Sequence, residues 1–308
     1  MARHDRAPRF GTVVTAMVTP FDADGALDLD AASSLARWLV DNGSTGLVVA
    51  GTTGEGPVLN DAERLDLFRA VCEAVTVPVI ANTGTNDTAH SISLTAQAKD
   101  CGAEAVLVVT PYYNRPSQDG LFDHFKAVAG ATDLPVVLYD IPVRSGRRIS
   151  TSTTLRLCEA TSNVVAVKDS TADPAGAAKL ICRAPSSFEL YCGEDSLTLP
   201  LLSVGAVGVV SVASHWAGLQ MVEMIEAFLA GEVDRACRIN QTLLDSYEFE
   251  STERFPNPLP AKAACRAQGL DVGQCRPPMG AAPPELDGEA RLLLSRLGAP
   301  AGAGGGLG

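Results

Sequence analysis

"VVAVK", residues 164–168, is a short run of small apolar residues that ends in a charged one. Such a run, apolar nearly throughout and rich in valine, is typical of a parallel strand covered on both faces. The runs of this kind lie at residues 12–18, 46–50, 77–81, 105–109, 135–139, 164–168, 188–192 and 207–212. Stretches with helical spacing follow each of them, as crossovers between parallel strands require. The pattern predicts an α/β fold, a closed (β/α)8 TIM barrel, with a doubly wound open sheet as the alternative.

Helix-capping residues mark where helices begin, and the end of the alternating strand and helix pattern marks where the barrel ends. Asn60 and Glu63 have the spacing of a capping box at the start of a helix. Asp30 is expected to be the N-cap of the helix that comes before this one in the chain. After residue 212 the apolar pattern is helical only, which predicts additional C-terminal helices. The expected segments are a disordered N-terminal tail (1–10), the barrel (11–212), a C-terminal helical extension (213–298) and a disordered C-terminal tail (299–308).

Composition and charge exclude several classes of function. A formal net charge of −12 disfavours binding to nucleic acid and to anionic membrane surfaces. No apolar run is long enough to span a bilayer, and the first ten residues lack the apolar stretch of a signal peptide, so we expect a cytoplasmic protein. The eight cysteines form no C-x-x-C pair and the four histidines show no ligand spacing. Neither a disulfide framework nor a metal site is therefore expected.

Active residues of a TIM barrel lie where its strands end, at the C-terminal face. The segments in such positions are "GTTGEG" (51–56), "TPYYNRP" (110–116), "YDIPVRSG" (139–146) and Lys168 itself. Lys168 is either a solvated lysine at a sheet edge or a Schiff-base nucleophile. The second interpretation has a physical basis, because burial in an apolar strand disfavours the charged form of the amine and leaves it able to attack a carbonyl group.

The other segments also have both a structural and a chemical interpretation. The 51–56 stretch is either an ordinary turn or a nest of N–H and hydroxyl groups that holds a carboxylate, and it has neither the P-loop nor the dinucleotide-binding pattern. The tyrosines of 110–116 either cover a core edge or relay a proton, and Tyr139 needs a partner for its hydroxyl group. Arg144 is either solvated or holds a carboxylate bidentately.

Together these segments resemble the dihydrodipicolinate synthase and N-acetylneuraminate lyase family of Schiff-base aldolases. The resemblance extends from about residue 10 to about residue 280, with "GTTGE", "TPYYNRPSQDGLFDHF", "YDIPVRSG", "VVAVKDS" and "GVVSV" in the family's order. Gly-Thr-Thr in place of Gly-Ser-Thr, the Tyr-Tyr pair and Arg144 favour the synthase branch. That branch condenses pyruvate with L-aspartate 4-semialdehyde in diaminopimelate and lysine biosynthesis. The alternatives are a sugar-acid aldolase, a hydratase-aldolase and a catalytically silent ligand-binding relative.

The resemblance implies a role for each candidate residue. Pyruvate would form an imine with Lys168, so that neither a metal nor an organic cofactor is needed. Thr53 would hold the pyruvate carboxylate, and Arg144 would bind that of the second substrate. The remaining implied site residues are Tyr139, Thr52 and Tyr113 for a proton relay, and Gly193 and Val210 for the lining of the pyruvate pocket. The resemblance also implies a homotetramer, a pair of tight dimers, in which Tyr113 reaches into a neighbouring subunit.

The sequence departs from the family's pattern where lysine-inhibited members bind lysine. Those members commonly carry a histidine at the position of Asp61 and a glutamate at that of His90. A histidine lacks the carboxylate that would receive the ammonium group of lysine. We therefore expect weak or absent feedback inhibition by lysine, although Asn86 and Tyr112 match the family.

Overall fold

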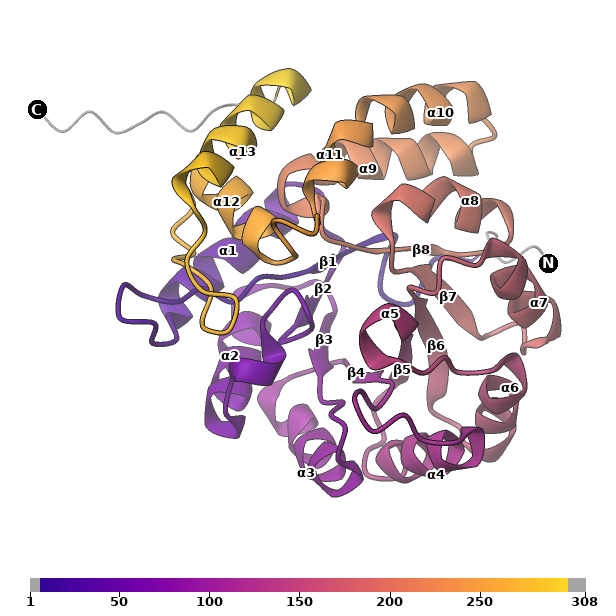
Figure 1. Ribbon diagram of the computed structural model, residues 1–308. Coiled ribbons are helices and arrows are strands. Elements are labelled where there is room, and N and C mark those ends of the chain that lie inside the picture. Colours follow the sequence, from indigo (N-terminus) through magenta and orange to yellow (C-terminus); the bar gives the residue numbers. More distant parts are fainter. Residues whose placement is uncertain (1–5, 299–308) are drawn as a thin grey trace, which may run out of the picture.

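The computed structural model describes residues 6–298, and these form a closed barrel of eight parallel strands surrounded by helices (Figure 1). Each strand pairs with its neighbours in sequence, and β8 closes the ring against β1. The (β/α)8 prediction is therefore confirmed, and the open-sheet alternative is wrong. The expected C-terminal tail and residues 1–5 of the expected N-terminal tail lie outside the described residues.

The strands lie within the predicted apolar runs or extend one residue past them. Their bounds are β1 Val13–Ala16, β2 Gly46–Val49, β3 Val79–Asn82, β4 Ala105–Val109, β5 Val136–Asp140, β6 Val164–Asp169, β7 Glu189–Cys192 and β8 Gly208–Ser211. Nearly all of their residues are buried, which explains the almost unbroken apolar runs.

The crossover helices of the barrel are α1 Leu29–Asp41, α2 Asp61–Ala74, α3 Thr88–Ala98, α4 Gln118–Ala129, α5 Pro142–Ser145, α6 Thr151–Ala160, α7 Pro174–Arg183 and α8 Thr198–Ser203. Short 3-10 helices lie beside them: η2 Gly56–Val58, η3 Lys99–Cys101 and η4 Asp195–Leu197. The capping box of Asn60 and Glu63 is confirmed at the start of α2. The cap of α1 was misplaced, because Asp28 and not Asp30 accepts the hydrogen bond from the Ala31 amide, at 2.9 Å.

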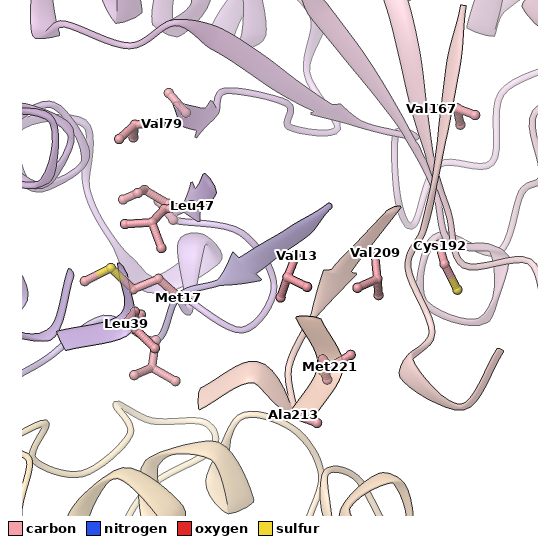
Figure 2. Packing of buried hydrophobic residues seen from close by; sticks show 14 of the residues in the cluster. Val13, Met17, Leu39, Leu47, Val79, Val167, Cys192, Val209, Ala213 and Met221 are labelled. Atoms are coloured by element: carbon pink, nitrogen blue, oxygen red, sulfur yellow. The ribbon is translucent and has the colours of Figure 1, made fainter. Parts of the chain in front are cut away.

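Apolar side chains fill two layers, one inside the barrel and one between the strands and the helices. Figure 2 shows part of the outer layer, where Val13 of β1 and Val209 of β8 lie next to each other in register. Side chains of a strand alternate between the two layers. In β6, Val167 belongs to the outer layer and Ala166 to the inner one. The same alternation directs Lys168 to the interior of the barrel.

The C-terminal helices pack against one side of the barrel (Figure 1). They are α9 Ser214–Leu229, α10 Val233–Thr242, α11 Leu244–Phe249, α12 Leu259–Ala267 and α13 Pro284–Leu297. Helix α9 contacts β1, α12 contacts α9 and α13, and α11 contacts η4 next to the end of β7. We propose that the barrel proper ends at residue 212 and that residues 213–298 form the extension. Within residues 6–298, no helix combines the length and apolarity that crossing a membrane requires.

Candidate active site

Lys168 lies at the C-terminal end of β6 and is only 5% exposed. In the sheet register it is level with Tyr139 of β5 on one side and Tyr191 of β7 on the other. Its Nζ atom lies 4.2 Å from the centroid of the Tyr139 ring. A side chain with this burial is not a solvated lysine at a sheet edge, so the first interpretation of the sequence does not fit.

A glycine beside Lys168 leaves room for the lysine side chain. A Cβ atom on Gly193 would lie 2.1 Å from the Ser170 Oγ atom and 3.0 Å from the Cγ atom of Lys168. Neither distance is compatible with van der Waals contact. The Ser170 hydroxyl group donates a hydrogen bond to the Gly193 carbonyl oxygen at 3.0 Å and fixes this close approach. A side chain at position 193 would therefore displace the Ser170 hydroxyl group and crowd the Lys168 side chain.

The 51–56 turn is held in place by the C-terminal extension. The buried Thr53 hydroxyl oxygen accepts a hydrogen bond from Asn257 Nδ2 at 2.9 Å. Glu55 has left-handed backbone dihedral angles, with φ at 54°, a region that residues other than glycine rarely occupy. Its carboxylate accepts a hydrogen bond from the Arg276 backbone amide at 2.8 Å and pairs with the Lys262 ammonium group, also at 2.8 Å. The turn is thus anchored at two residues, Thr53 and Glu55.

The ion pair between Lys262 and Glu55 is almost fully buried. Lys262 also donates to the Gln274 carbonyl oxygen at 2.8 Å, and its Nζ atom lies 4.2 Å from the centre of the Phe21 ring. Burial lowers the pKa of Lys262, while the neighbouring Glu55 carboxylate opposes that shift. Each contact compensates part of the cost of removing the ammonium group from water.

Most of the candidate residues surround one cavity of about 470 Å³. Those that line it are Thr52, Thr53, Tyr139, Arg144, Lys168 and Gly193. A second cavity, of about 310 Å³, lies next to the first, because Thr52, Tyr139 and Arg144 line both of them. Three of the four segments that the sequence placed at strand ends, 51–56, 139–146 and Lys168, converge on the first cavity, whereas 110–116 contributes Tyr112 to the second.

Two candidate residues lie outside this cavity lining. Val210 of β8 is buried in the inner layer of the barrel. Tyr113 is 91% exposed, and its backbone has a φ of 73°. A left-handed conformation at a bulky residue costs on the order of 1–3 kcal/mol. This conformation presents the Tyr113 side chain away from its own chain.

Among the further residues that line the cavity, those with a carboxyl or amide side chain are Glu194, Asp195, Glu250 and Asn257, and none of them was predicted as a site residue. Glu194 and Asp195 follow β7 directly, so the rule that active residues follow barrel strands could have identified them. Glu250 and Asn257 belong to the C-terminal extension, where no strand end marks them. Their position depends on how the extension packs on the barrel, and no local pattern in the sequence indicates it.

Two acidic groups in and beside the site, Glu194 and Asp140, have raised pKa values. Burial raises the pKa of Glu194, and Asp195 adds to the effect, while Lys168 and Arg144 oppose it. Burial also raises the pKa of Asp140, at the end of β5, to about 7 despite a hydrogen bond from the Ile149 amide. Burial therefore favours the protonated form of Glu194 in the cavity and of Asp140 next to it.

The fold and this cavity define a TIM-barrel protein with a buried lysine at the C-terminal ends of its strands. The chain belongs to the dihydrodipicolinate synthetase family, whose sequence pattern matches residues 9–296. A 4-hydroxy-tetrahydrodipicolinate synthase of Moorella thermoacetica is 49% identical over 292 residues, which cover 94% of this chain and 99% of that protein. The Bacillus subtilis enzyme of the same name is 47% identical over 288 residues, covering 93% of this chain and 97% of that protein.

Solved structures of the same family share the fold. A dihydrodipicolinate synthase from Bacillus anthracis superposes with a TM-score of 0.90 at 44% identity, covering 94% of this chain and 99% of that one. The enzyme from Cyanidioschyzon merolae, solved with lysine bound, gives a TM-score of 0.91 at 41% identity, with 94% and 99% covered. The Acinetobacter baumannii enzyme, solved in complex with pyruvate, gives 0.89 at 33% identity, with 94% and 100% covered.

Proposed function

We infer that this chain is a lyase that condenses pyruvate with L-aspartate 4-semialdehyde to 4-hydroxy-tetrahydrodipicolinate, in diaminopimelate and lysine biosynthesis. The observation that carries the proposal is the Lys168 amine, buried in the cavity beside Tyr139. Nearly half of the residues are identical to relatives named for this activity, over almost the whole chain. That similarity favours this synthase over a sugar-acid aldolase, a hydratase-aldolase or a catalytically silent relative.

The proposed reaction begins with attack of the neutral Lys168 amine on the ketone carbon of pyruvate. Loss of water gives an imine, and loss of a methyl proton converts it into an enamine. The enamine carbon attacks the aldehyde, whose oxygen takes up a proton. The amine of the second substrate then displaces Lys168, which closes the ring and frees the enzyme. The chemistry uses the lysine itself as the covalent catalyst, with no organic cofactor and no metal.

We propose that protons move through Tyr139, Thr52 and Tyr113, because hydroxyl groups are suited to such a relay. Tyr139 and Thr52 line the cavity, and Tyr113 points outward from its own chain. We therefore propose that Tyr113 enters the site of a neighbouring subunit in a homotetramer built from tight dimers. This arrangement also provides a contact for an otherwise exposed aromatic side chain.

The remaining roles concern binding. Thr53 is proposed to hold the pyruvate carboxylate together with backbone amides of its turn, and the Asn257 hydrogen bond keeps its hydroxyl group oriented. Arg144, which lines both cavities, is proposed to bind the carboxylate of the second substrate. Gly193 leaves space for Lys168, and Val210 shapes the apolar side of the pyruvate pocket. A cytoplasmic location fits these soluble substrates.

Reductive trapping tests the proposal. The protein is incubated with pyruvate, reduced with borohydride and digested, and the adduct is located by mass spectrometry. The expected result is one stable adduct on Lys168, absent in Lys168→Ala and present in the control Lys126→Ala, which removes an exposed lysine. A wild-type protein without an adduct would refute the Schiff-base mechanism. Activity with L-aspartate 4-semialdehyde, compared with N-acetylmannosamine, then distinguishes the synthase from sugar-acid aldolases.

A further inference from the structure

A carboxyl group of the C-terminal extension forms part of the wall around Lys168. Glu250 directly follows α11, is 7% exposed and lines the Lys168 cavity. Asp195 of η4, which is 2% exposed, lines the same cavity and is an electrostatic neighbour of the Glu250 carboxyl group. Helix α11 and η4 pack directly against each other. Two acidic side chains from distant parts of the chain therefore meet in a buried place.

The hydrogen bonds of this pair lack one donor. Asp195 Oδ2 accepts from the backbone amides of Val212 and Ala213, both at 2.8 Å. Asp195 Oδ1 and Glu250 Oε2 are buried, and neither receives a hydrogen bond from any donor within residues 6–298. Two ionised carboxylates in this position would repel each other and would both remain partly unsatisfied. A single proton between them removes the repulsion and supplies the hydrogen bond.

We propose that Glu250 keeps a proton, which it donates to the Asp195 carboxylate, and that this pair is a positioning device for the Lys168 pocket. The proton belongs on Glu250, because the two backbone amides stabilise the negative charge on Asp195. Burial raises the pKa of Glu250 well above its usual value, and Asp195 adds to that shift. The pair ties the extension to the loop after β7 and, through Val212, to the end of β8.

The groups around the pair favour a neutral Glu250. Glu194 is a second acidic neighbour, and Lys168 is the cation that partly offsets it. Tyr247 of α11 has a pKa raised by burial and by both acids, so it stays neutral. Burial lowers the pKa of His215 in α9 to about 4, so it adds no positive charge near pH 7. The Cys192 thiol of β7, whose pKa burial also raises, is neutral too.

The state of Glu250 has a consequence for Lys168 that rests on the proposed function. An ionised Glu250 would favour the ammonium form of Lys168 electrostatically, and this form cannot attack pyruvate. A protonated Glu250 leaves one negative charge fewer in the cavity. When Glu250 loses its proton at alkaline pH, the hydrogen bond to Asp195 is lost and the added charge repels Asp195. Imine formation should then slow down.

Infrared difference spectroscopy of the full chain tests the proton directly and requires no activity. A pH jump from neutral to alkaline should remove the carbonyl band of a protonated carboxylic acid in the wild-type protein. That band should be weaker in the Glu250→Gln difference spectrum by the contribution of one carboxyl group, because an amide does not titrate, while Asp140 contributes to both spectra. An acid band that is equally strong in Glu250→Gln would overturn the assignment of the proton to this residue.

Borohydride trapping at several pH values tests the positioning role. Glu250→Gln keeps a neutral donor toward Asp195, so its trapping rate at neutral pH should stay within about threefold of wild type. Its trapping rate should also fall less than that of the wild type when the pH is raised to alkaline values. Glu250→Ala leaves the buried Asp195 oxygen without a donor, and its rate should fall by about tenfold or more. Equal losses in both variants, or an unchanged alkaline limb in Glu250→Gln, would overturn the role.

The two measurements separate this proposal from the function on which it rests. If Glu250→Gln lacks part of the acid band that the wild-type protein shows, the proton on Glu250 is established even when no pyruvate adduct forms. In that case the Schiff-base function fails and the carboxyl pair stands. If the adduct forms and the band is unaffected by Glu250→Gln, the function stands and the pair is refuted.

Discussion

Replacing Lys262 with methionine should destabilise the protein and loosen the turn that is proposed to hold pyruvate. Methionine has a similar length and apolar volume, so it fills the space but removes the charge. The Glu55 carboxylate then remains buried with the Arg276 amide as its remaining donor among the contacts described above. Because only Gly54 separates Glu55 from the threonines of the turn, we expect the unpaired charge to shift Thr52 and Thr53.

The geometry of the pair sets the size of the effect. At the 2.8 Å separation between Lys262 and Glu55, and at an effective dielectric constant of about 20, the Coulomb attraction is about 6 kcal/mol. In the wild-type protein the desolvation of both ions offsets most of it. The single variant loses the attraction and keeps the cost of burying Glu55, so we expect a loss of about 3–5 kcal/mol. Loss of the hydrogen bond to Gln274 is included in this range.

A second variant separates the charge from the packing. Lys262→Met combined with Glu55→Gln removes both charges, so its loss should be only about 1–2 kcal/mol, mainly from the unpaired Gln274 carbonyl group. Urea denaturation of the wild-type protein and of both variants measures the free energy of unfolding. Borohydride trapping measures the yield of pyruvate adduct, which should fall if the turn is displaced. A loss below about 1 kcal/mol for Lys262→Met, or a double variant as unstable as the single one, would refute the reasoning.

Three further predictions follow from other groups of the site. Burial raises the pKa of Asp140 to about 7, so its contribution to stability is complete below about pH 4 and is lost as the pH rises through about 7. The side chain in Asp140→Asn still accepts the hydrogen bond from the Ile149 amide but does not titrate. The melting temperature of this variant minus that of the wild type should therefore be larger at about pH 8 than at about pH 5. An equal difference at both pH values would contradict this. Arg144→Ala should raise the KM for L-aspartate 4-semialdehyde by about tenfold or more and leave the pyruvate adduct within about twofold, and equal losses in both would count against its role. L-lysine at about 1 mM should barely inhibit the coupled assay, because His90 offers no carboxylate and already contacts Asp61 at 2.8 Å; a sub-millimolar inhibition constant would show the opposite.

The barrel could be predicted from the sequence because its signals are local. A buried parallel strand is an apolar run of a few residues, and all the predicted runs became strands. The period of two along such a strand also fixes the inward direction of Lys168. The cap of α1 was misplaced by two residues, since Asp28 and Asp30 are both suitable capping residues and only the backbone geometry decides between them.

The residues of the candidate site also differ in whether a local sequence signal marks them. Residues that follow a strand, such as Thr53 and Arg144, could be proposed because strand ends of a barrel meet at one face. Glu250, Asn257 and Lys262 could not, because their place depends on how the extension packs against the barrel. The Thr53–Asn257 hydrogen bond joins residues that are 204 positions apart, and no local pattern reports such a contact. The catalytic and binding roles themselves stay predictions.

The anchoring of the 51–56 turn has a consequence for the order in which the protein matures during synthesis. All strands of the barrel have been translated by residue 211, but the partners of the turn are Asn257, Lys262 and Arg276. When a ribosome has translated the barrel, it has therefore not yet translated the residues that anchor the turn proposed to bind pyruvate. A chain that terminates early would contain every proposed catalytic side chain and still lack an ordered place for the pyruvate carboxylate. If the turn binds pyruvate as proposed, we expect competence for the reaction to depend on the last part of the chain.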